Sequence, residues 1–420
     1  MTELSIVLIT KNQAWNIPRL IGSVLQATSL FPSREIVLVD SNSTDETVKF
    51  ASRYPINVVR LRPGQRLSPA AGRYIGYKRT RGEFVLFLDG DMELLQGWLG
   101  QALQVMREIS KAGVMLSSRV IELPPSGASV PPSPAPITHG AIPKEVSRVS
   151  FVVGGAALYR RSVLEQVGTF NPFLYSDEEP ELYLRIRHAG YRVLQLDFPI
   201  VRHYSQPQET PSALLGRRKR NFLLGVGQCI RYHMGTKLLW PYLKERGLWS
   251  LTAALWLAAG LGSLLWTLIT QDLIPLGLWA LFCCLLLGIA TVRKRSLRRG
   301  LYTLFHRVLM AEGLLRGFLM KPLPAESYPE DAEVLLECGF EESFHRVSTK
   351  SGVAQSNVTI RAGMVCDQFL TPQGQNPYQF VRKYCCTEAS YGSNMYSSIA
   401  RCPLQLGFPH LHKRRFFFWG

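Results

Sequence analysis

The chain has 420 residues, which is enough for one α/β domain of ordinary size with additional segments. Its formal net charge of +17 is typical of proteins that meet nucleic acid or an anionic membrane surface, and the basic residues at 293–299 adjoin a long apolar segment, which favours a membrane and no nucleic-acid partner. Eight cysteines without a CxxC pair argue against a disulfide framework, and the first residues lack the pattern of a signal peptide.

The first half of the chain alternates between short apolar runs and a helical pattern. Apolar runs at 5–10, 35–40 and 56–61 predict strands, and residues 17–25 have the apolar spacing of an amphipathic helix. The run at 84–88 is apolar throughout, as expected of a strand buried on both faces of a parallel sheet. Strands and helices that alternate at this spacing form βαβ units. The sequence therefore predicts an α/β domain with a mostly parallel sheet.

Polar side chains follow three of these predicted strands, at the point where each strand ends. Thr10 and Asn12 follow the first strand, Asp40 ends the second, and Asp89 and Asp91 follow the run at 84–88. Because ligands bind outside the carboxyl ends of strands in open α/β sheets, these residues mark a candidate ligand site. Two carboxylates one residue apart could converge on a hard cation such as Mg²⁺, but a strand followed by a solvated Asp-Gly turn would have the same pattern.

An acidic segment lies further along the chain. Glu178, Glu179 and Glu181 surround Pro180, a residue suited to the first turn of a helix. Such a cluster could supply a catalytic carboxylate, or it could only complement the dipole of a helix. His203 follows another apolar run and could be a metal ligand or an ordinary histidine.

Together these motifs resemble family 2 glycosyltransferases of the GT-A fold, a Rossmann-like α/β fold. The resemblance covers roughly residues 4–205 and depends on four segments in this order: 5–12, 39–47, 72–76 and 82–91. Two positions depart from the family pattern, because Ser41 stands where a second aspartate is usual and Tyr74 stands where asparagine is usual. The stretch 154–161 is similar to the family's acceptor-side loop and the helix that follows it.

The resemblance implies an inverting enzyme that moves a sugar from a nucleotide-diphosphate donor to a lipid-linked or glycan acceptor. It implies donor contacts from five residues: Thr10, Asn12, Asp40, Arg73 and Asp89. It also implies Mg²⁺ or Mn²⁺ as cofactor, held by Asp89, Asp91 and His203. The catalytic base falls on Glu179, where the family usually has aspartate, and Glu178 is its main competitor.

Two long apolar segments follow the predicted domain. Residues 248–269 and 273–292 contain no charged side chain, and each is long enough to span a hydrocarbon core of about 30 Å. A buried core hairpin is the alternative, although soluble helices are rarely apolar on every face. Basic residues flank both outer ends, and none lies in the connection at 270–272, so the positive-inside rule places both ends and the catalytic domain in the cytoplasm. The sequence thus predicts a multi-pass membrane protein in contact with membrane lipids.

The predicted organisation has five segments. They are a GT-A domain (1–205), a basic amphipathic interfacial segment with a helix over 217–232 (206–247), a transmembrane helical hairpin (248–292), a cytoplasmic juxtamembrane helix and linker (293–345), and a poorly ordered tail (346–420). A proline-rich stretch at 124–136 is predicted to be a mobile loop beside the acceptor site.

Three other functions are compatible with parts of the sequence. Residues 228–232 resemble the Gln-x-x-Arg-Trp signature of processive polysaccharide synthases, with tyrosine in place of tryptophan. A nucleotidyltransferase would share the α/β sheet, but the chain has no glycine-rich phosphate loop near its start. A non-catalytic membrane scaffold built on a GT-A fold is the third alternative.

Overall fold

A computed structural model of the chain describes residues 2–125, 143–146, 154–205 and 210–338. Most of the stretch at 124–136 and all of the tail at 346–420 lie outside the described residues, so the predictions made for them stay untested.

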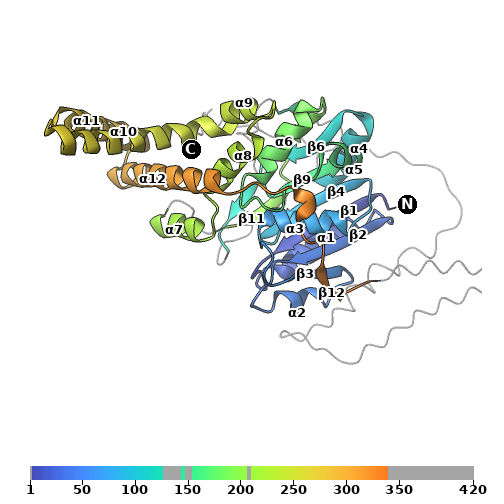
Figure 1. The fold of residues 1–420 in the computed structure, drawn as a ribbon. Helices are drawn as coiled ribbons and strands as arrows, with labels where there is room; N and C mark the ends of the chain where they lie inside the picture. Colours follow the sequence, from blue (N-terminus) through green and yellow to red (C-terminus); the bar gives the residue numbers. More distant parts are fainter. Residues whose placement is uncertain (1, 126–142, 147–153, 206–209, 339–420) are drawn as a thin grey trace, which may run out of the picture. The chain divides into compact units, whose positions relative to one another are not determined.

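A nine-stranded sheet forms the centre of the catalytic domain, with the order β12-β3-β2-β1-β4-β9-β6-β10-β8 (Figure 1). Its parallel part consists of β3 (Asn57–Leu61), β2 (Arg34–Asp40), β1 (Leu4–Thr10) and β4 (Phe84–Asp89). The register places Thr10 beside Asp40 and Ile9 beside Asp89. The carboxyl ends of β2, β1 and β4 therefore meet at one edge of the sheet, as the sequence predicts.

The other half of the sheet is mixed, so the expected α/β class is confirmed with fewer parallel pairs than predicted. The strand β9 runs antiparallel to both β4 and β6, and β10 runs parallel to β6 but antiparallel to β8. Their bounds are β6 (Ala112–Ser117), β8 (Lys144–Glu145), β9 (Ala156–Arg160) and β10 (Arg192–Leu196). The stretch predicted as a loop and helix from 154 is mainly the strand β9, and the helix α5 (Arg161–Val167) follows it.

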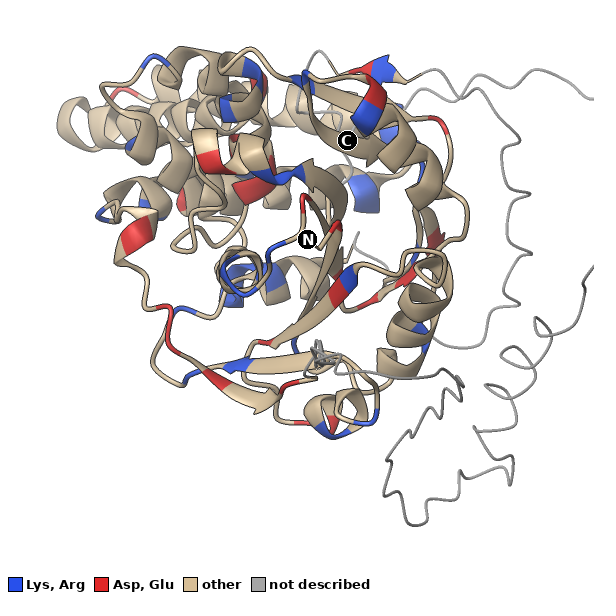
Figure 2. Ribbon diagram, turned by 90° about the vertical axis from the view of Figure 1, so that its right-hand side faces the viewer, with Lys and Arg blue, Asp and Glu red and all other residues tan. Residues whose placement is uncertain are grey.

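Helices cover both faces of this sheet, which explains why its central strands are apolar throughout. Ile6 and Leu8 of β1 point into one core, and Val7 and Ile9 point into the other. The first core is closed by α1 (Ile17–Ala27), α2 (Thr47–Ala51) and α4 (Trp98–Glu108), and the second by α3 (Pro69–Lys78), α5 and α6 (Glu178–His188). Figure 2 shows the central strands mainly in tan, with charged residues on the helices, in the loops and at strand ends.

A small second sheet lies beside the end of β4. It has the order β5-β11-β7, with bounds β5 (Met92–Leu94), β11 (Val201–Tyr204) and β7 (Ile121–Leu123). Its register pairs His203 with Met92 on one side and with Glu122 on the other. This sheet therefore brings His203 next to Asp91, which precedes β5.

The segment after the domain folds into several helices. The single helix predicted over 217–232 is wrong in its bounds, because the structure has two shorter helices, α7 (Pro211–Lys219) and α8 (Gly225–His233). The apolar side of α8 is buried, and a Cβ atom added at Gly227 would lie 2.1 Å from the Leu314 carbonyl oxygen of α12 (Leu297–Leu319). The α8 face that the sequence assigned to a membrane surface is thus covered by α12.

Two helices have the length and apolar composition needed to cross a membrane. A short helix α9 (Leu239–Tyr242) and a π-helical turn η2 (Leu243–Gly247) lead into α10 (Leu248–Thr270), which makes one helix of 32 residues, and α11 (Ile274–Lys294) follows. Within its most apolar window, α11 buries no residue against the rest of the protein. Apolar side chains left exposed along a whole helix favour a membrane environment for this hairpin.

The chain then returns to the catalytic domain, which the sequence analysis did not predict. The helix predicted after the second apolar segment is present as α12, and its position beside a membrane stays a prediction. After a 3₁₀ turn, η3 (Ala325–Ser327), the strand β12 (Ala332–Leu336) pairs antiparallel with β3 at the edge of the sheet (Figure 1). The Tyr328 ring packs edge-on against Tyr74 and Phe173, and Glu330 lies 2.8 Å from Lys78 Nζ. Part of the predicted linker therefore belongs to the catalytic domain's sheet.

Candidate active site

Asp40 lies at the end of β2 and has no exposed surface. Its Oδ2 accepts hydrogen bonds from the Ser43 backbone N–H at 2.9 Å and from Arg60 Nε at 3.2 Å. Its Oδ1 is buried and has no partner. Because buried polar atoms are normally hydrogen-bonded, this oxygen is suited to accept a hydrogen bond from a bound ligand.

The two other polar residues after β1 have different surroundings. Thr10 is buried beside Asp40, in register with it. Asn12 has a left-handed backbone (φ 54°), and its Oδ1 accepts a hydrogen bond of 2.8 Å from the Thr44 N–H. The Asn12 N–H in turn donates to Ser43 Oγ at 2.8 Å. Asn12 thus ties the loop after β1 to the loop after β2 and shapes the edge around Asp40.

The Arg73 guanidinium lies close to three carboxylates, those of Asp89, Glu178 and Glu179. It comes from α3, is 2% exposed, and donates from Nη1 to Glu178 Oε1 at 2.6 Å and from Nη2 to Asp89 Oδ1 at 2.8 Å. The same Nη2 lies 3.7 Å from Glu179 Oε1. Both terminal nitrogens of the predicted donor-binding arginine are therefore engaged by carboxylates from α6 and β4.

Gly154 and Gly155, directly before β9, allow the carboxylates of Asp89 and Glu179 to lie close to the backbone. Both carboxylate oxygens of Glu179 accept the Gly155 N–H, at 3.1 and 3.0 Å. A Cβ atom at Gly154 would lie 2.2 Å from Glu179 Oε2, and one at Gly155, whose φ is +92°, would lie 2.7 Å from Asp89 Oδ2. Glycine at both positions leaves room for the carboxylates where they lie, and the positive φ of Gly155 itself favours glycine.

Burial changes the proton affinity of this group. Burial raises the pKa of Asp89 to about 7 although the Arg73 guanidinium opposes the change, and the nearby Asp91, Glu179 and Glu178 add to the rise. Burial also raises the pKa of Glu178, again against the effect of Arg73. Strongly perturbed carboxyl groups at a strand edge are typical of a functional site.

Asp91 and His203 lie side by side, as the sequence predicts for a metal site. His203 Nε2 is 3.3 Å from Asp91 Oδ2, and His203 Nδ1 is 3.0 Å from Glu122 Oε1. Burial would lower the pKa of His203, but the hydrogen bonds to Asp91 and Glu122 raise it to about 9. Asp91 Oδ1 is buried without a partner. Glu122 was missed in the sequence, because only the pairing of β7 with β11 brings it here.

The donor set at Asp91 fits a divalent cation in its chemistry. A buried carboxylate oxygen without a partner is a ligand that Mg²⁺ or Mn²⁺ accepts, and His203 beside it becomes a ligand once it gives up the proton that Asp91 and Glu122 stabilise. Asp89, the third predicted ligand, has one carboxylate oxygen on Arg73. Among the described residues, no three His, Cys, Asp or Glu side chains are already gathered around one point as metal ligands would be.

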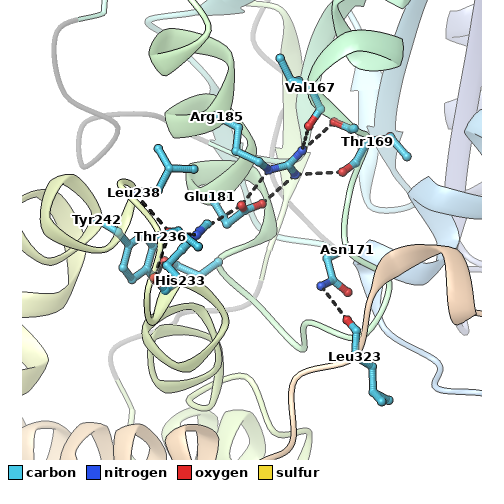
Figure 3. Close-up of polar contacts among 12 residues, drawn as sticks. Val167, Thr169, Asn171, Glu181, Arg185, His233, Thr236, Leu238, Tyr242 and Leu323 are labelled. Atoms are coloured by element: carbon cyan, nitrogen blue, oxygen red, sulfur yellow. Dashed lines mark hydrogen bonds and ion pairs between the residues drawn. The ribbon is translucent and has the colours of Figure 1, made fainter.

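A second buried network fixes the helix that carries Glu178 and Glu179. Glu181 accepts hydrogen bonds from Arg185 Nε at 2.7 Å and Nη2 at 2.8 Å, and it lies 3.1 Å from His233 Nε2 (Figure 3). Arg185 also donates to the carbonyl oxygens of Gly168 at 2.7 Å and Thr169 at 2.9 Å. Although burial alone would raise the pKa of Glu181, Arg185 and His233 lower it to about 2. Glu181 thus anchors α6, whereas Glu178 and Glu179 face the site.

Two family models match the chain in succession. The model described as glycosyl transferase family 2 matches residues 5–168, and the one described as glycosyl transferase family group 2 matches residues 140–292. The first match spans β1, β2 and β4 together with their terminal carboxylates. Residues 5–168 belong to glycosyl transferase family 2. Its α/β sheet, followed by two long apolar helices, agrees with the expected GT-A fold.

Several curated glycosyltransferases are similar to this glycosyltransferase domain. Poly(ribitol-phosphate) beta-N-acetylglucosaminyltransferase TarS of Staphylococcus aureus is 25% identical over 187 residues, which cover 44% of this chain and 32% of TarS. The chain thus spans about a third of the length of TarS. Pre-mycofactocin glycosyltransferase of Mycobacterium tuberculosis is 27% identical over 215 residues, which cover 49% of this chain and 43% of that protein. Uncharacterized glycosyltransferase YwdF of Bacillus subtilis is 24% identical over 254 residues, 58% of this chain and 92% of YwdF.

Solved glycosyltransferase structures are also similar to the chain. The match to mannosyltransferase PcManGT from Pyrobaculum calidifontis, in complex with GDP-Man and Mn²⁺, covers 74% of this chain and 87% of the PcManGT chain. The sequence identity is 16% and the TM-score is 0.49. The match to TarS in complex with UDP-GlcNAc covers 75% of this chain and 92% of the TarS chain in that structure. The sequence identity is 19% and the TM-score is 0.42.

Proposed function

We propose that this chain is an inverting glycosyltransferase that moves a sugar from a nucleotide-diphosphate donor to a hydroxyl group of a lipid-linked or glycan acceptor. The observation that carries the proposal is the arrangement of Asp40, Asp89 and Glu179. The first two end β2 and β4, the strands on either side of β1 in the parallel part of the sheet, and Glu179 reaches the same edge from α6 through Gly155. This arrangement supports a donor side at Asp40 and Asp89 and a base at Glu179, at the same edge of the sheet.

The residues have distinct roles in this proposal. The free Oδ1 of Asp40 accepts a hydrogen bond from the nucleobase, and Asp89 faces the ribose side. Glu179 removes the proton of the acceptor hydroxyl as its oxygen attacks the anomeric carbon, and the bond from that carbon to the nucleotide diphosphate breaks. Asp91 and His203, with Asp89, would hold Mg²⁺ or Mn²⁺, which offsets the negative charge that develops on the leaving diphosphate.

The apolar hairpin α10–α11 supports a reaction at a membrane face. The segment α10–α11 is apolar and exposed, and basic residues at 293–295 follow its second helix. In this proposal the catalytic domain is cytoplasmic, so the donor comes from the cytoplasm and the acceptor from the membrane.

The processive alternative depends on residues 228–232, and the structure gives that motif another use. The Gln228 side chain accepts from the Tyr175 N–H and donates to the Phe173 carbonyl oxygen, both at 3.0 Å. Arg231 is exposed, contacts Met234 and the Phe318 ring, and does not reach the carboxylates of the site. The motif therefore supports the loop before α6 and does not itself favour a processive synthase.

A panel of nucleotide sugars tests the function. Purified membranes with the wild-type chain should release nucleotide from one donor, and the release should require Mg²⁺ or Mn²⁺. The Asp91→Asn variant should lose divalent-dependent donor binding, because the amide lacks the charge that holds the cation, while its unfolding temperature stays near the wild-type value. The exposed Asp197, which pairs with Arg119, gives a matched control in Asp197→Asn. Normal binding and turnover by Asp91→Asn would show that the metal assignment is wrong.

The proposed topology has its own test. A reporter fused after Val292 should be active in the cytoplasm, because Arg293, Lys294 and Arg295 follow the second apolar helix and basic residues are retained on that side. A reporter fused in the 270–272 connection should give the opposite result. A cytoplasmic signal from the connection, or an external signal after Val292, would contradict the orientation and the cytoplasmic active site.

A further inference from the structure

Asp177, the residue directly before Glu178 and Glu179, has an unusual backbone. It precedes the first turn of α6 in the left-handed conformation, with φ 64° and ψ 13°. Residues with a side chain adopt this conformation at an energetic cost and keep it only where the surroundings hold them. Asp177 makes no side-chain hydrogen bond to its own helix, so its carboxylate does not act as an N-terminal cap.

The carboxylate of Asp177 is instead held by the helix that leads into the membrane hairpin. The Tyr242 hydroxyl donates to its Oδ2, and Arg246 donates from Nη2 to its Oδ1. Arg246 Nε adds contacts of 3.1 Å to Oδ1 and 3.3 Å to Oδ2. The Asp177 side chain is 5% exposed and Tyr242 is fully buried, whereas the Arg246 side chain is 31% exposed, so the anchored carboxylate lies inside the protein and the arginine reaches it from the surface. A bidentate pair of this kind fixes both position and orientation.

Tyr242 and Arg246 belong to a distinctive part of that helix. Tyr242 ends α9, Arg246 lies in the π-helical turn η2, and α10 continues from Leu248 without a break. A π-helical turn is rare and is frequently found at functional sites. Arg246, which pairs with Asp177, lies within this π-helical turn. The first apolar helix and the candidate catalytic segment are therefore connected through Arg246 and Asp177.

Further contacts join the same two parts of the molecule. Arg187 of α6 pairs with Glu245 of η2, and Glu181 lies 3.1 Å from His233 of α8 (Figure 3). A Cβ atom at Gly225 would lie 2.2 Å from the Ser176 carbonyl oxygen, which shows how closely α8 meets the loop before α6. These contacts hold the body of α6, whereas Tyr242 and Arg246 hold the carboxylate next to the two glutamates.

We propose that Tyr242 and Arg246 are positioning residues for glycosyl transfer. They hold Asp177 in its left-handed conformation, which directs Glu178 toward Arg73 and Glu179 toward Gly155. This inference rests on the proposed function, because it assigns Glu179 the role of base. It adds that residues just before the first apolar helix set the geometry of the catalytic carboxylate.

The test separates positioning from folding and from donor binding. Arg246→Gln and Tyr242→Phe should lower the kcat of transfer, by on the order of 10²-fold for Arg246→Gln, because a small displacement of a base has such an effect. The KM for the donor should not change, since Asp40 and Asp89 come from the sheet. Arg231→Gln is the matched control, because Arg231 lies on the neighbouring helix α8 and is exposed.

A rescue variant gives the sharpest result. Glycine adopts a positive φ without an anchor, so adding Asp177→Gly to Arg246→Gln should restore most of the kcat. A full kcat in Arg246→Gln, or a double variant as slow as the single one, would overturn the proposal. A donor KM that rises as much as kcat falls would also overturn it.

Hydrogen exchange tests the anchor without any activity. Backbone amides of residues 173–185 should exchange faster in Arg246→Gln than in wild-type protein or Arg231→Gln, and unchanged exchange would refute the anchor. If the wild-type chain transfers no sugar from any donor, the proposed function fails, and the exchange measurement still decides whether Arg246 holds Asp177.

Discussion

Replacing Glu179 with glutamine should lower transfer to the acceptor by about 10²- to 10⁴-fold while donor binding stays nearly intact. Glutamine keeps the shape of the side chain and can still accept the Gly155 N–H, but it cannot take a proton from the acceptor hydroxyl. The donor contacts proposed for Asp40 and Asp89 come from other elements and should remain. Donor affinity by titration and transfer rate at saturating donor must be measured separately on the same preparation.

The neighbour Glu178 supplies the decisive comparison. Its Oε1 is 2.6 Å from Arg73 Nη1, so its carboxylate is already engaged in an ion pair. Glu178→Gln should weaken that pair and reduce transfer less than Glu179→Gln does. The exposed Glu165 on α5 serves as a control for the chemical change itself. Full transfer by Glu179→Gln together with an inactive Glu178→Gln would move the base by one residue. Full transfer by both would leave this segment with a helix-dipole role only.

The second large effect concerns stability. Arg73→Met should lower the free energy of unfolding by about 3–5 kcal/mol, because it removes the positive partner of buried carboxylates and leaves their charge uncompensated. Arg73 is 2% exposed and lies within 3.7 Å of Asp89, Glu178 and Glu179. Unfolding of the purified protein in detergent, followed by tryptophan fluorescence against denaturant, measures the change.

Two further variants make this measurement specific. Arg73→Lys keeps the charge, but a single ammonium group cannot reproduce the fork that reaches both Asp89 and Glu178, so the loss should be intermediate. Arg79→Met changes an exposed arginine at the end of the same helix and should have little effect. If Arg73→Met unfolds at the wild-type denaturant concentration, Arg73 does not compensate the buried carboxylates.

The sequence by itself determined the strands and their functional ends. A strand covered by helices on both faces must be apolar at every position, so runs such as 84–88 are visible without a structure. Because parallel strands end at the same edge, Asp40, Asp89 and the residues after β1 were placed together from their positions alone. The apolar helical hairpin was visible for a similar reason, since length and uninterrupted apolar composition are local properties.

Tertiary structure alone decided which charged side chains meet. Arg73 contacts Glu178 across more than a hundred residues, Glu122 reaches His203 through strand pairing, and Arg246 finds Asp177 from a different helix. The return of the chain as β12 and the cover of α8 by α12 were likewise invisible, because the apolar pattern of a helix or strand does not show which segment packs against it. Local patterns determine secondary structure and the edge where ligands bind, whereas the partner of a buried charge depends on contacts between distant segments that only the folded chain brings together.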